Sequence, residues 1–434
     1  MIVEIFLIVT TISILYINFL HMLLWLGSKG SLIKNNKKSI FPSISILVPA
    51  YNEEKNIPSL IKNFLELNYP KNRIEVIFID DNSNDKTFEY MKKGKRILES
   101  NGIKTKILKN EERKGKAHSL NKALKIAKGR FVAVIDADSL LEKDSLKNCI
   151  KHFYDGNKLN KKVAAVTANI LVKNPKTIMQ KLQNLEFIMI SCFRKLQEKI
   201  NAIMVTPGPL SVFRRDILLK LGGFDEKNLT EDIEIAWRIL ANNYKIRMAF
   251  EAKVWTEYPK DLKKWWMQRT RWNLGGFQTL GKYLVYIRRK TTLRKIIIPY
   301  SIIGYVLTVL GVLISSYLIF NSIQNFLLYV LEAIKYGTNP FQRFEIKYAI
   351  DLFTIFGLII FLSSLYLISI SFDSHKILKN YSKETKNYSI KIDKISLILF
   401  PTAYILLFPL VLIYSVFKFL EIKRKNISKA WLTK

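Results

Sequence analysis

Cysteine is scarce in this chain of 434 residues, which contains only Cys149 and Cys192. Two cysteines are too few for a disulfide framework or a zinc site, so we expect the folded domain in a reducing compartment. Acidic residues are also scarce, because 35 Asp and Glu stand against 69 Lys and Arg. The net charge of +34 favours phosphate-bearing ligands, nucleic acid or an anionic membrane surface, although much of the lysine also fits a compositional bias of the coding DNA.

Glycine-rich phosphate loops are absent as well. Neither GxGxxG nor GxxxxGK[ST] follows any predicted strand, which excludes the dinucleotide fingerprint and the P-loop. A diphosphate would then need a metal ion and basic side chains. Residues 114–121, KGKAHSLN, supply cations at the start of a predicted helix, where backbone N–H groups also favour anions. For any single lysine of this stretch, a solvated helix start is the alternative interpretation.

Four long apolar runs are candidate membrane spans, at 2–26, 296–320, 349–372 and 395–420. The first run lacks a basic start and a small-residue cleavage site, so we interpret it as a retained anchor and not as a secretory signal. Between the first two runs lie about 250 residues with ordinary globular patterning, the size of one α/β domain.

Basic residues near the spans predict how the globular domain is oriented. None precedes the first span, whereas several follow it or precede the second: Lys29, Lys34, Lys37, Lys38, Arg288, Arg289, Lys290, Arg294 and Lys295. The domain is therefore expected to face the cytoplasm. After four simple crossings the basic residues 423–425 would lie outside, unless Pro401 and Pro409 break the last run into a re-entrant or interfacial segment.

These features predict a multi-pass protein of the cell membrane with five parts. They are an N-terminal transmembrane anchor (1–28), a cytoplasmic globular domain (40–260), an interfacial helix region (261–295), a transmembrane region of about three spans (296–420) and a basic tail (421–434).

Strand-like and helix-like patterns alternate through the globular part. Short apolar runs predict strands at 43–49, 73–80, 103–108, 131–135 and 163–168, with helical periodicity between most of them. This alternation predicts an α/β fold with a mostly parallel, doubly wound sheet. An amphipathic stretch at 178–200 is typical of a core-packed surface helix or of a helix lying on the membrane.

Three predicted strands end in polar clusters. The run at 131–135 leads into Asp136 and Asp138, and alternate residues of an extended chain point the same way, so these carboxylates can share one hard cation. Tyr51 and Asp81 follow two earlier strands in the same manner. Because ligands of open α/β sheets lie outside the carboxyl ends of the strands, we expect the three clusters to form one site.

Two further motifs follow the predicted strands. Gly208 lies between prolines in a stiff loop whose backbone can approach a ligand, although a plain turn is the default interpretation. Thr230 fits the N-cap of an amphipathic helix that has Glu231 and Asp232 in its first turn. Capping accounts for one of these acids and does not require the second.

Gln268, Arg271 and Trp272 fall at i, i+3 and i+4 of a predicted helix and therefore share one face. An amide, a guanidinium and an indole suit phosphate oxygens and the apolar side of a sugar ring. The alternative is an aromatic-basic belt at the membrane interface, which accounts in part for Trp265 and Trp266.

Six motifs together resemble the membrane-embedded, processive members of glycosyltransferase family 2, which include cellulose, chitin, hyaluronan and poly-N-acetylglucosamine synthases. The motifs are VPAYNEE at 48–54, IDDNSND at 79–85, KGKAHSLN at 114–121, DAD at 136–138, TED at 230–232 and QRTRW at 268–272. Each is weak alone, but six in family order make a specific signal. The resemblance implies a GT-A-like, Rossmann-type catalytic domain with interfacial amphipathic and transmembrane helices.

The resemblance also implies roles on the donor side. Tyr51 and Asp81 would hold the nucleobase, with Glu53 nearby. Lys116 would neutralise the diphosphate, Asp136 would lie near the ribose and the metal, and Asp138 would bind Mg²⁺ or Mn²⁺. Another pair, Gln268 and Arg271, would close over the diphosphate.

On the acceptor side, the resemblance implies that Trp272 stacks on the acceptor sugar, and we place Gly208 there too. Inverting transfer is one in-line displacement at the anomeric carbon, in which a base activates the acceptor hydroxyl while metal and cations stabilise the departing diphosphate. By resemblance Asp232 is that base, and we assign Glu231 to the same catalytic group. Asp232 must stay ionised and metal-free, whereas Asp138 must be a ligand.

Three functional hypotheses follow. The leading one is an inverting, metal-dependent glycosyltransferase that moves a sugar from a nucleotide donor, expected to be UDP-linked, to a growing β-linked polysaccharide at the lipid bilayer. An alternative is transfer of a single sugar to a lipid acceptor. A third is a non-enzymatic basic membrane scaffold, against which the strand-end carboxylates argue, and we expect no nucleic-acid partner. Export of long polymer calls for a homo-oligomer or an export partner.

Overall fold

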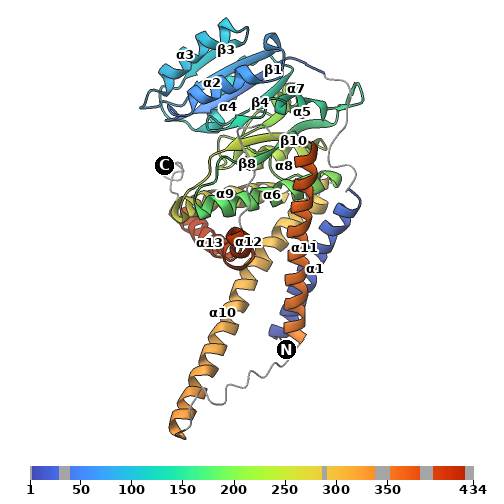
Figure 1. Cartoon of the computed structure of the whole chain (residues 1–434), viewed down its shortest axis with the longest axis vertical. Helices are drawn as coiled ribbons and strands as arrows, with labels where there is room; N and C mark the ends of the chain where they lie inside the picture. The colour runs from blue at the N-terminus through green and yellow to red at the C-terminus, as the bar shows by residue number, and fades with distance from the viewer. Residues whose placement is uncertain (1, 29–39, 286–290, 338–351, 382–393, 426–434) are drawn as a thin grey trace.

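The computed structural model describes residues 2–28, 40–285, 291–337, 352–381 and 394–425. An α/β domain stands at one end of the molecule (Figure 1). Two helices, α6 (Ile178–Lys199) and α9 (Leu262–Tyr283), lie beneath this domain, and long helices extend away from them. The lysines at 29–38, the basic residues 288–290 and the tail from 426 lie outside the described residues.

An eight-stranded sheet in the order β3-β2-β1-β4-β9-β8-β10-β5 forms the centre of the α/β domain. Its first half is parallel and consists of β3 (Lys104–Lys109), β2 (Ile74–Asp80), β1 (Ile44–Ala50) and β4 (Phe131–Val134). Every residue of β1, β2 and β4 is buried, which explains their continuous apolar runs, because a parallel sheet covered on both faces has no solvent side. The four strands predicted in this region are confirmed.

The second half of the sheet mixes strand directions. β9 (Ser211–Arg214) runs antiparallel to both β4 and β8 (Val163–Val172), whereas β10 (Lys245–Thr256) is parallel to β8 and antiparallel to β5 (Leu140–Leu141). Four neighbouring pairs are parallel and three are antiparallel, so the predicted mostly parallel sheet is confirmed. A separate hairpin pairs β6 (Tyr154–Asp155) with β7 (Lys158–Leu159).

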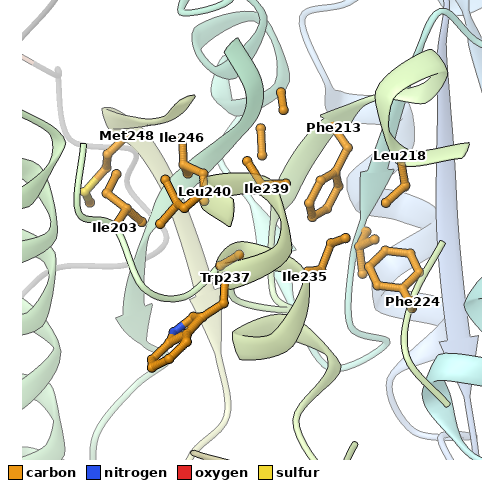
Figure 2. Close-up of a cluster of buried hydrophobic side chains, with 14 of the residues drawn as sticks. Ile203, Phe213, Leu218, Phe224, Ile235, Trp237, Ile239, Leu240, Ile246 and Met248 are labelled. Carbon is orange, nitrogen blue, oxygen red and sulfur yellow. The ribbon is translucent and has the colours of Figure 1, made fainter. Parts of the chain in front are cut away.

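Helices cover both faces of the sheet and enclose two cores. The first core contains α4 (Lys116–Ile126), α7 (Arg215–Lys220) and α8 (Glu231–Ala241), and the second contains α2 (Ile57–Glu66), α3 (Thr87–Ser100) and α5 (Ser145–Lys151). Figure 2 shows part of the first core, where Ile235 and Ile239 of α8 lie beside Phe213 of β9. This packing fixes the first turn of α8 relative to the sheet.

The helix predicted over 178–200 is confirmed as α6. It begins at a capping box, in which Thr177 accepts the N–H of Gln180 and the Gln180 side chain accepts the N–H of Thr177. Leu182 of α6 packs in one cluster with Trp265 of α9 and Tyr404 of the C-terminal segment. Part of its apolar face is therefore packed inside the protein.

Two described stretches are long and apolar enough to cross a bilayer. They are Ile8–Leu26 of α1 (Ile2–Leu26), and Leu293–Lys335, in which a π-helical turn continues into α10 (Ile298–Lys335). Within α11 (Leu352–Tyr381), the part whose side chains the structure describes includes the apolar stretch Phe361–Ser374.

The last apolar run is bent. Its two halves, Lys394–Tyr404 and Leu407–Ile422, meet at 42°, as in a broken span or a re-entrant loop. These halves contain α12 (Lys394–Leu399) and α13 (Leu407–Lys425), and Pro401 lies in the π-helical turn between them. The bend accords with the predicted break, whereas the number and direction of membrane crossings stay predictions.

Candidate active site

The loops that follow β1 and β2 are tied to each other. Asn52 and Asn82 adopt the left-handed conformation, with φ of 55° and 63°, which turns each loop sharply at the end of its strand. Asn52 donates its N–H to Ser83 Oγ and accepts the N–H of Asn84 at its side-chain oxygen, both at 3.0 Å. These bonds join two of the predicted strand-end clusters into one polar surface.

Asp81 organises the start of α4. This buried carboxylate accepts the N–H groups of Lys114 and Gly115 at 3.0 and 2.8 Å and the side-chain amide of Asn110 at 2.8 Å. Gly115 has a φ of 91°, a conformation that favours glycine. Asp81 therefore positions the KGK turn, and its predicted contact with a nucleobase stays a prediction.

Tyr51, after β1, is half-buried. Its ring centroid lies 4.0 Å from the guanidinium carbon of Arg113, in the loop that leads into α4. Cationic and aromatic groups stack favourably at this distance. The ring predicted to hold a nucleobase is therefore already paired with a basic side chain.

Lys116, the first residue of α4, joins the end of β4 to the start of α8. Its Nζ lies 2.6 Å from Asp136 Oδ1 and 3.2 Å from Glu231 Oε1. Burial alone would lower the pKa of Lys116, but Asp136 and Glu231 raise it overall, so the group stays cationic. Three motifs that are far apart in the sequence thus meet at one ammonium group.

Gly208 lies against this ion pair. A β-carbon at its position would stand 2.3 Å from Lys116 Nζ and 2.6 Å from Asp136 Oδ2, closer than non-bonded atoms approach. Thr206 of the same loop donates its N–H and its hydroxyl to the Asp232 carbonyl oxygen, at 3.1 and 2.9 Å. The glycine lets this loop pass between the β4 carboxylate and the first turn of α8.

The first turn of α8 presents two carboxylates in different electrostatic environments. Burial and the charge of Glu231 raise the pKa of Asp232 to about 6, against the lowering effect of Lys116 and Arg271. Burial would also raise the pKa of Glu231, but Lys116 and Arg271 lower it overall. A carboxylate with a pKa near 6 suits a general base at neutral pH. Asp232 fits that role, and Glu231 fits the role of an anion that holds Lys116.

The predicted cap of α8 is wrong in its detail. Thr230 occupies the N-cap position, but its hydroxyl donates to Asn228 Oδ1 at 3.2 Å and makes no capping bond to the helix. Its side chain instead packs against α9, where a β-carbon on Gly275 would stand 2.1 Å from Thr230 Oγ1. The close approach of α8 to α9 therefore uses the residue that would otherwise cap α8.

Asp138 lies among other acidic groups. Burial and the charges of Asp136 and Glu53 raise its pKa to about 7. Its Oδ1 accepts the hydroxyl groups of Thr256 and Ser139, each at 3.1 Å. Such crowded negative charge is what a divalent cation neutralises, and the two hydroxyl groups hold the ligand oxygens in place.

The donor set fits a hard divalent cation. No group of three or more His, Cys, Asp and Glu side chains converges as metal ligands in the described part of the chain. Mg²⁺ is commonly held by one or two carboxylates together with substrate phosphates. Asp136 and Asp138 match that arrangement, with the remaining ligands left to a diphosphate and water.

The helix predicted for the QRTRW motif is confirmed as α9, which packs against α8. Arg271 is exposed and close enough to Glu231 and Asp232 to lower the pKa of both carboxylates. Trp272 is half-buried and packs against the cluster that contains Ile170 and Tyr258. Their predicted contacts with donor and acceptor stay predictions.

Arg269, which the sequence did not single out, is a buried residue of this motif, as is Thr270. Its Nη2 lies 2.6 Å from Glu186 Oε2 of α6, and its Nη1 donates to Gln268 Oε1 at 3.0 Å. Its guanidinium carbon lies 4.0 Å from the ring centroid of Trp272, so Arg269 is in contact with that ring. Tyr404 donates to the same Glu186 oxygen at 2.6 Å.

The position of Trp265 does not fit the alternative interpretation of an interfacial belt. Its side chain is fully buried and donates its indole N–H to the Tyr404 hydroxyl at 2.7 Å. Trp266 is half-buried, with its ring centroid 5.8 Å from that of Tyr414. The aromatic residues at this position therefore join α9 to the C-terminal helices.

The end of β10 adds residues that sequence reasoning missed. Thr256, the last residue of this strand, bonds Asp138, and Tyr258 follows two residues later. Tyr258 is buried, with its ring centroid 4.2 Å from that of Phe187, and burial raises the pKa of its hydroxyl. Ligands of open α/β sheets lie outside the carboxyl ends of the strands. If β10 had been predicted, this rule would have identified Thr256 and Tyr258 as well.

The mostly parallel sheet flanked by helices is a GT-A-like fold. Residues 42–275 match the family model described as Glycosyltransferase like family 2. That match covers more than half of the chain, and the chain belongs to this family.

The chain is similar to several named glycosyltransferases. Probable glycosyltransferase YdaM of Bacillus subtilis (strain 168) is 33% identical over 292 residues, which cover 65% of this chain and 67% of that protein. The poly-beta-1,6-N-acetyl-D-glucosamine synthase of Staphylococcus aureus (strain COL) is 32% identical over 238 residues, or 55% of each protein. The chain thus matches little more than half the length of that synthase.

A solved structure shows the same fold. Mannosyltransferase PcManGT from Pyrobaculum calidifontis, in complex with GDP-Man and Mn²⁺, aligns with a TM-score of 0.58 over 87% of this chain and 100% of its own. The two sequences are 22% identical, so the likeness concerns the fold alone.

Proposed function

We propose that this protein is an inverting, metal-dependent glycosyltransferase that moves a sugar from a UDP-linked donor to a growing β-linked polysaccharide at the cell membrane. One observation carries the proposal: Lys116 Nζ lies 2.6 Å from Asp136 and 3.2 Å from Glu231. This contact supports a single site for the carboxylates expected on the donor side and on the base side.

The donor would occupy the edge of the sheet formed by β1, β2 and β4. Tyr51, Glu53 and Asp81 lie at the end expected to bind the nucleoside. Lys116 and Arg271 would bind oxygens of the diphosphate, and Gln268 lies on the same helix as Arg271. Asp136 and Asp138 would hold Mg²⁺ or Mn²⁺, which when bound supplies positive charge for the departing diphosphate.

The acceptor would approach from the side of α8 and α9. Asp232, ionised above its pKa of about 6, accepts the proton of the acceptor hydroxyl. The bond from the acceptor oxygen to the anomeric carbon forms as the bond from that carbon to the diphosphate breaks, so the configuration inverts. Trp272 and the loop of Gly208 lie on this side, and Glu231 keeps Lys116 in place.

The polysaccharide product and the membrane location rest on separate support. Relatives about 30% identical are named poly-beta-1,6-N-acetyl-D-glucosamine synthases, and two described stretches are apolar and long enough to span a bilayer. A multi-pass protein with its catalytic domain in the cytoplasm would use cytoplasmic nucleotide sugars. A second copy of the chain or an export partner would complete the path for long polymer.

Product analysis tests the proposal. Purified full-length protein is incubated with UDP-glucose, UDP-N-acetylglucosamine, UDP-glucuronate or GDP-mannose, with Mg²⁺ or Mn²⁺, and with or without a lipid acceptor. A ladder of products supports polysaccharide synthesis, and one lipid-bound sugar supports the single-transfer alternative. Failure of the wild type to consume any donor beyond the level of Asp232→Asn would refute an enzymatic function.

A further inference from the structure

Arg194 of α6 is a buried cation without a bonded anion. The residue is 8% exposed, and its Nη1 has no hydrogen-bond partner among the described residues. None of the ion pairs recorded within the described ranges includes Arg194. Arg269, the other buried arginine on this side, has Glu186 at 2.6 Å. Arg194 therefore lacks the partner that buried guanidinium groups ordinarily have.

Its neighbours place Arg194 on the acceptor side of the site. Phe187, Ile190 and Arg194 follow at i, i+3 and i+7 of α6, so they share one face of the helix. Phe187 and Ile190 pack in the cluster that contains Tyr258 and Trp272. Arg194 thus lies on the face of α6 that meets the tryptophan expected to contact the acceptor.

The charges that act on Arg194 also indicate a position on the acceptor side. Burial lowers the pKa of Arg194 to about 10, and the nearby Tyr258 and Asp232 offset part of this effect. The proposed donor diphosphate already has Lys116 and Arg271 as cationic partners. It therefore does not account for the buried charge of Arg194.

We propose that Arg194 binds an anionic group, a phosphate or a carboxylate, that the acceptor carries close to the hydroxyl deprotonated by Asp232. This inference rests on the proposed function and narrows its acceptor to an anionic molecule. A planar guanidinium binds either group through two parallel N–H···O bonds. Two sources offer this chemistry: the phosphate of a lipid-linked acceptor and the carboxylate of an acidic sugar.

Equilibrium binding without nucleotide sugar tests the site. Full-length protein in phosphatidylcholine vesicles is titrated with a polyprenyl phosphate or a glucuronate-terminated oligosaccharide, and with the uncharged polyprenol or a glucose-terminated oligosaccharide. We expect Arg194→Gln to weaken binding of one anionic probe at least about tenfold and Arg194→Lys to weaken it less, with no effect on the uncharged probes. Lys199→Gln, which removes the same charge at the exposed end of α6, is the matched control.

Thermal unfolding without ligand separates binding from a structural role. Arg194→Gln removes an uncompensated buried charge, so its melting temperature is expected to equal or exceed that of the wild type. A lower melting temperature, or equal binding of both anionic probes by wild type and Arg194→Gln, would overturn the anionic site.

Donor consumption by the wild type keeps the two proposals apart. If the wild type consumes a nucleotide sugar but Arg194→Gln binds the anionic probes as tightly as the wild type does, the anionic site is refuted and the proposed glycosyltransferase function is retained. If anion binding depends on Arg194 but no donor is consumed, the binding site stands and the proposed function fails.

Discussion

Arg269 and Glu186 form a buried ion pair between α9 and α6, with Nη2 and Oε2 2.6 Å apart. The same guanidinium donates to Gln268 and stacks on Trp272, so the pair fixes two residues of the QRTRW motif to the neighbouring helix. Tyr404 donates to the same carboxylate oxygen. The C-terminal apolar segment is thereby joined directly to the helix that borders the candidate active site.

Glu186→Gln is expected to reduce the free energy of unfolding by about 3–5 kcal/mol, because it leaves Arg269 buried without a counter-ion. A lower unfolding midpoint in detergent and a lower kcat for sugar transfer would show both effects. The double variant Glu186→Gln with Arg269→Met removes the stranded charge and should regain stability without regaining activity. Recovery of both together would contradict a positioning role for Arg269.

Gly208→Ala places a methyl group 2.3 Å from Lys116 Nζ. Because a lysine side chain can move aside, we expect little change in stability but a rise of at least about tenfold in KM for the nucleotide sugar, the scale of a lost charge-assisted contact. Gly281→Ala is the matched control, since a β-carbon at Gly281 meets nothing within 4 Å. If the two variants have equal kinetics, Gly208 is not part of the active site.

Transfer should lose rate in acid with an apparent pKa of about 6, the value of Asp232. The base must be ionised, so kcat/KM is expected to be level above this pKa and to fall about tenfold per pH unit below it. Glu231→Gln removes the neighbouring negative charge that raises this pKa, and it should move the acidic limb to lower pH. If the acidic limb of the pH profile does not move, Asp232 is not the base of the rate-limiting proton transfer.

Removal of divalent ions with a chelator should abolish transfer, and Mg²⁺ or Mn²⁺ should restore it. Thr256→Val deletes the hydroxyl that bonds Asp138 Oδ1 at 3.1 Å. We expect this variant to need about 10–100-fold more metal for half-maximal activity, as for other partners of metal ligands. Asp138→Asn should need more still. Unchanged metal titrations in both variants would argue against a cation at Asp138.

The strands and the site motifs were predictable where local sequence determines them. Buried parallel strands require unbroken apolar runs, and polar groups can follow only where the chain leaves the sheet, so Tyr51, Asp81 and Asp136 were found from single runs. β10 was missed because Glu251 and Lys253 interrupt its apolar pattern. Both charges are buried in ion pairs, Glu251 with Lys151 at 2.7 Å and Lys253 with Glu142 at 3.7 Å.

Pairings between distant elements could not be predicted from periodicity. β9 enters the sheet antiparallel between β4 and β8, an order that no short pattern specifies. Glu186 and Arg269 are 83 positions apart, and Glu186 and Tyr404 are 218 apart. Their partnership depends on the packing of α6, α9 and the C-terminal segment, which the sequence does not reveal residue by residue.

The most direct test of a single pocket with a metal side and a base side is the behaviour of Asp232→Asn in two assays on the full-length protein. Binding of UDP and of the four nucleotide sugars is measured by titration with Mn²⁺, and sugar transfer is measured with the same preparations. We expect Asp232→Asn to bind the preferred nucleotide sugar within about threefold of the wild type while its transfer rate falls about 10²–10⁴-fold. Transfer at the wild-type rate would contradict the account.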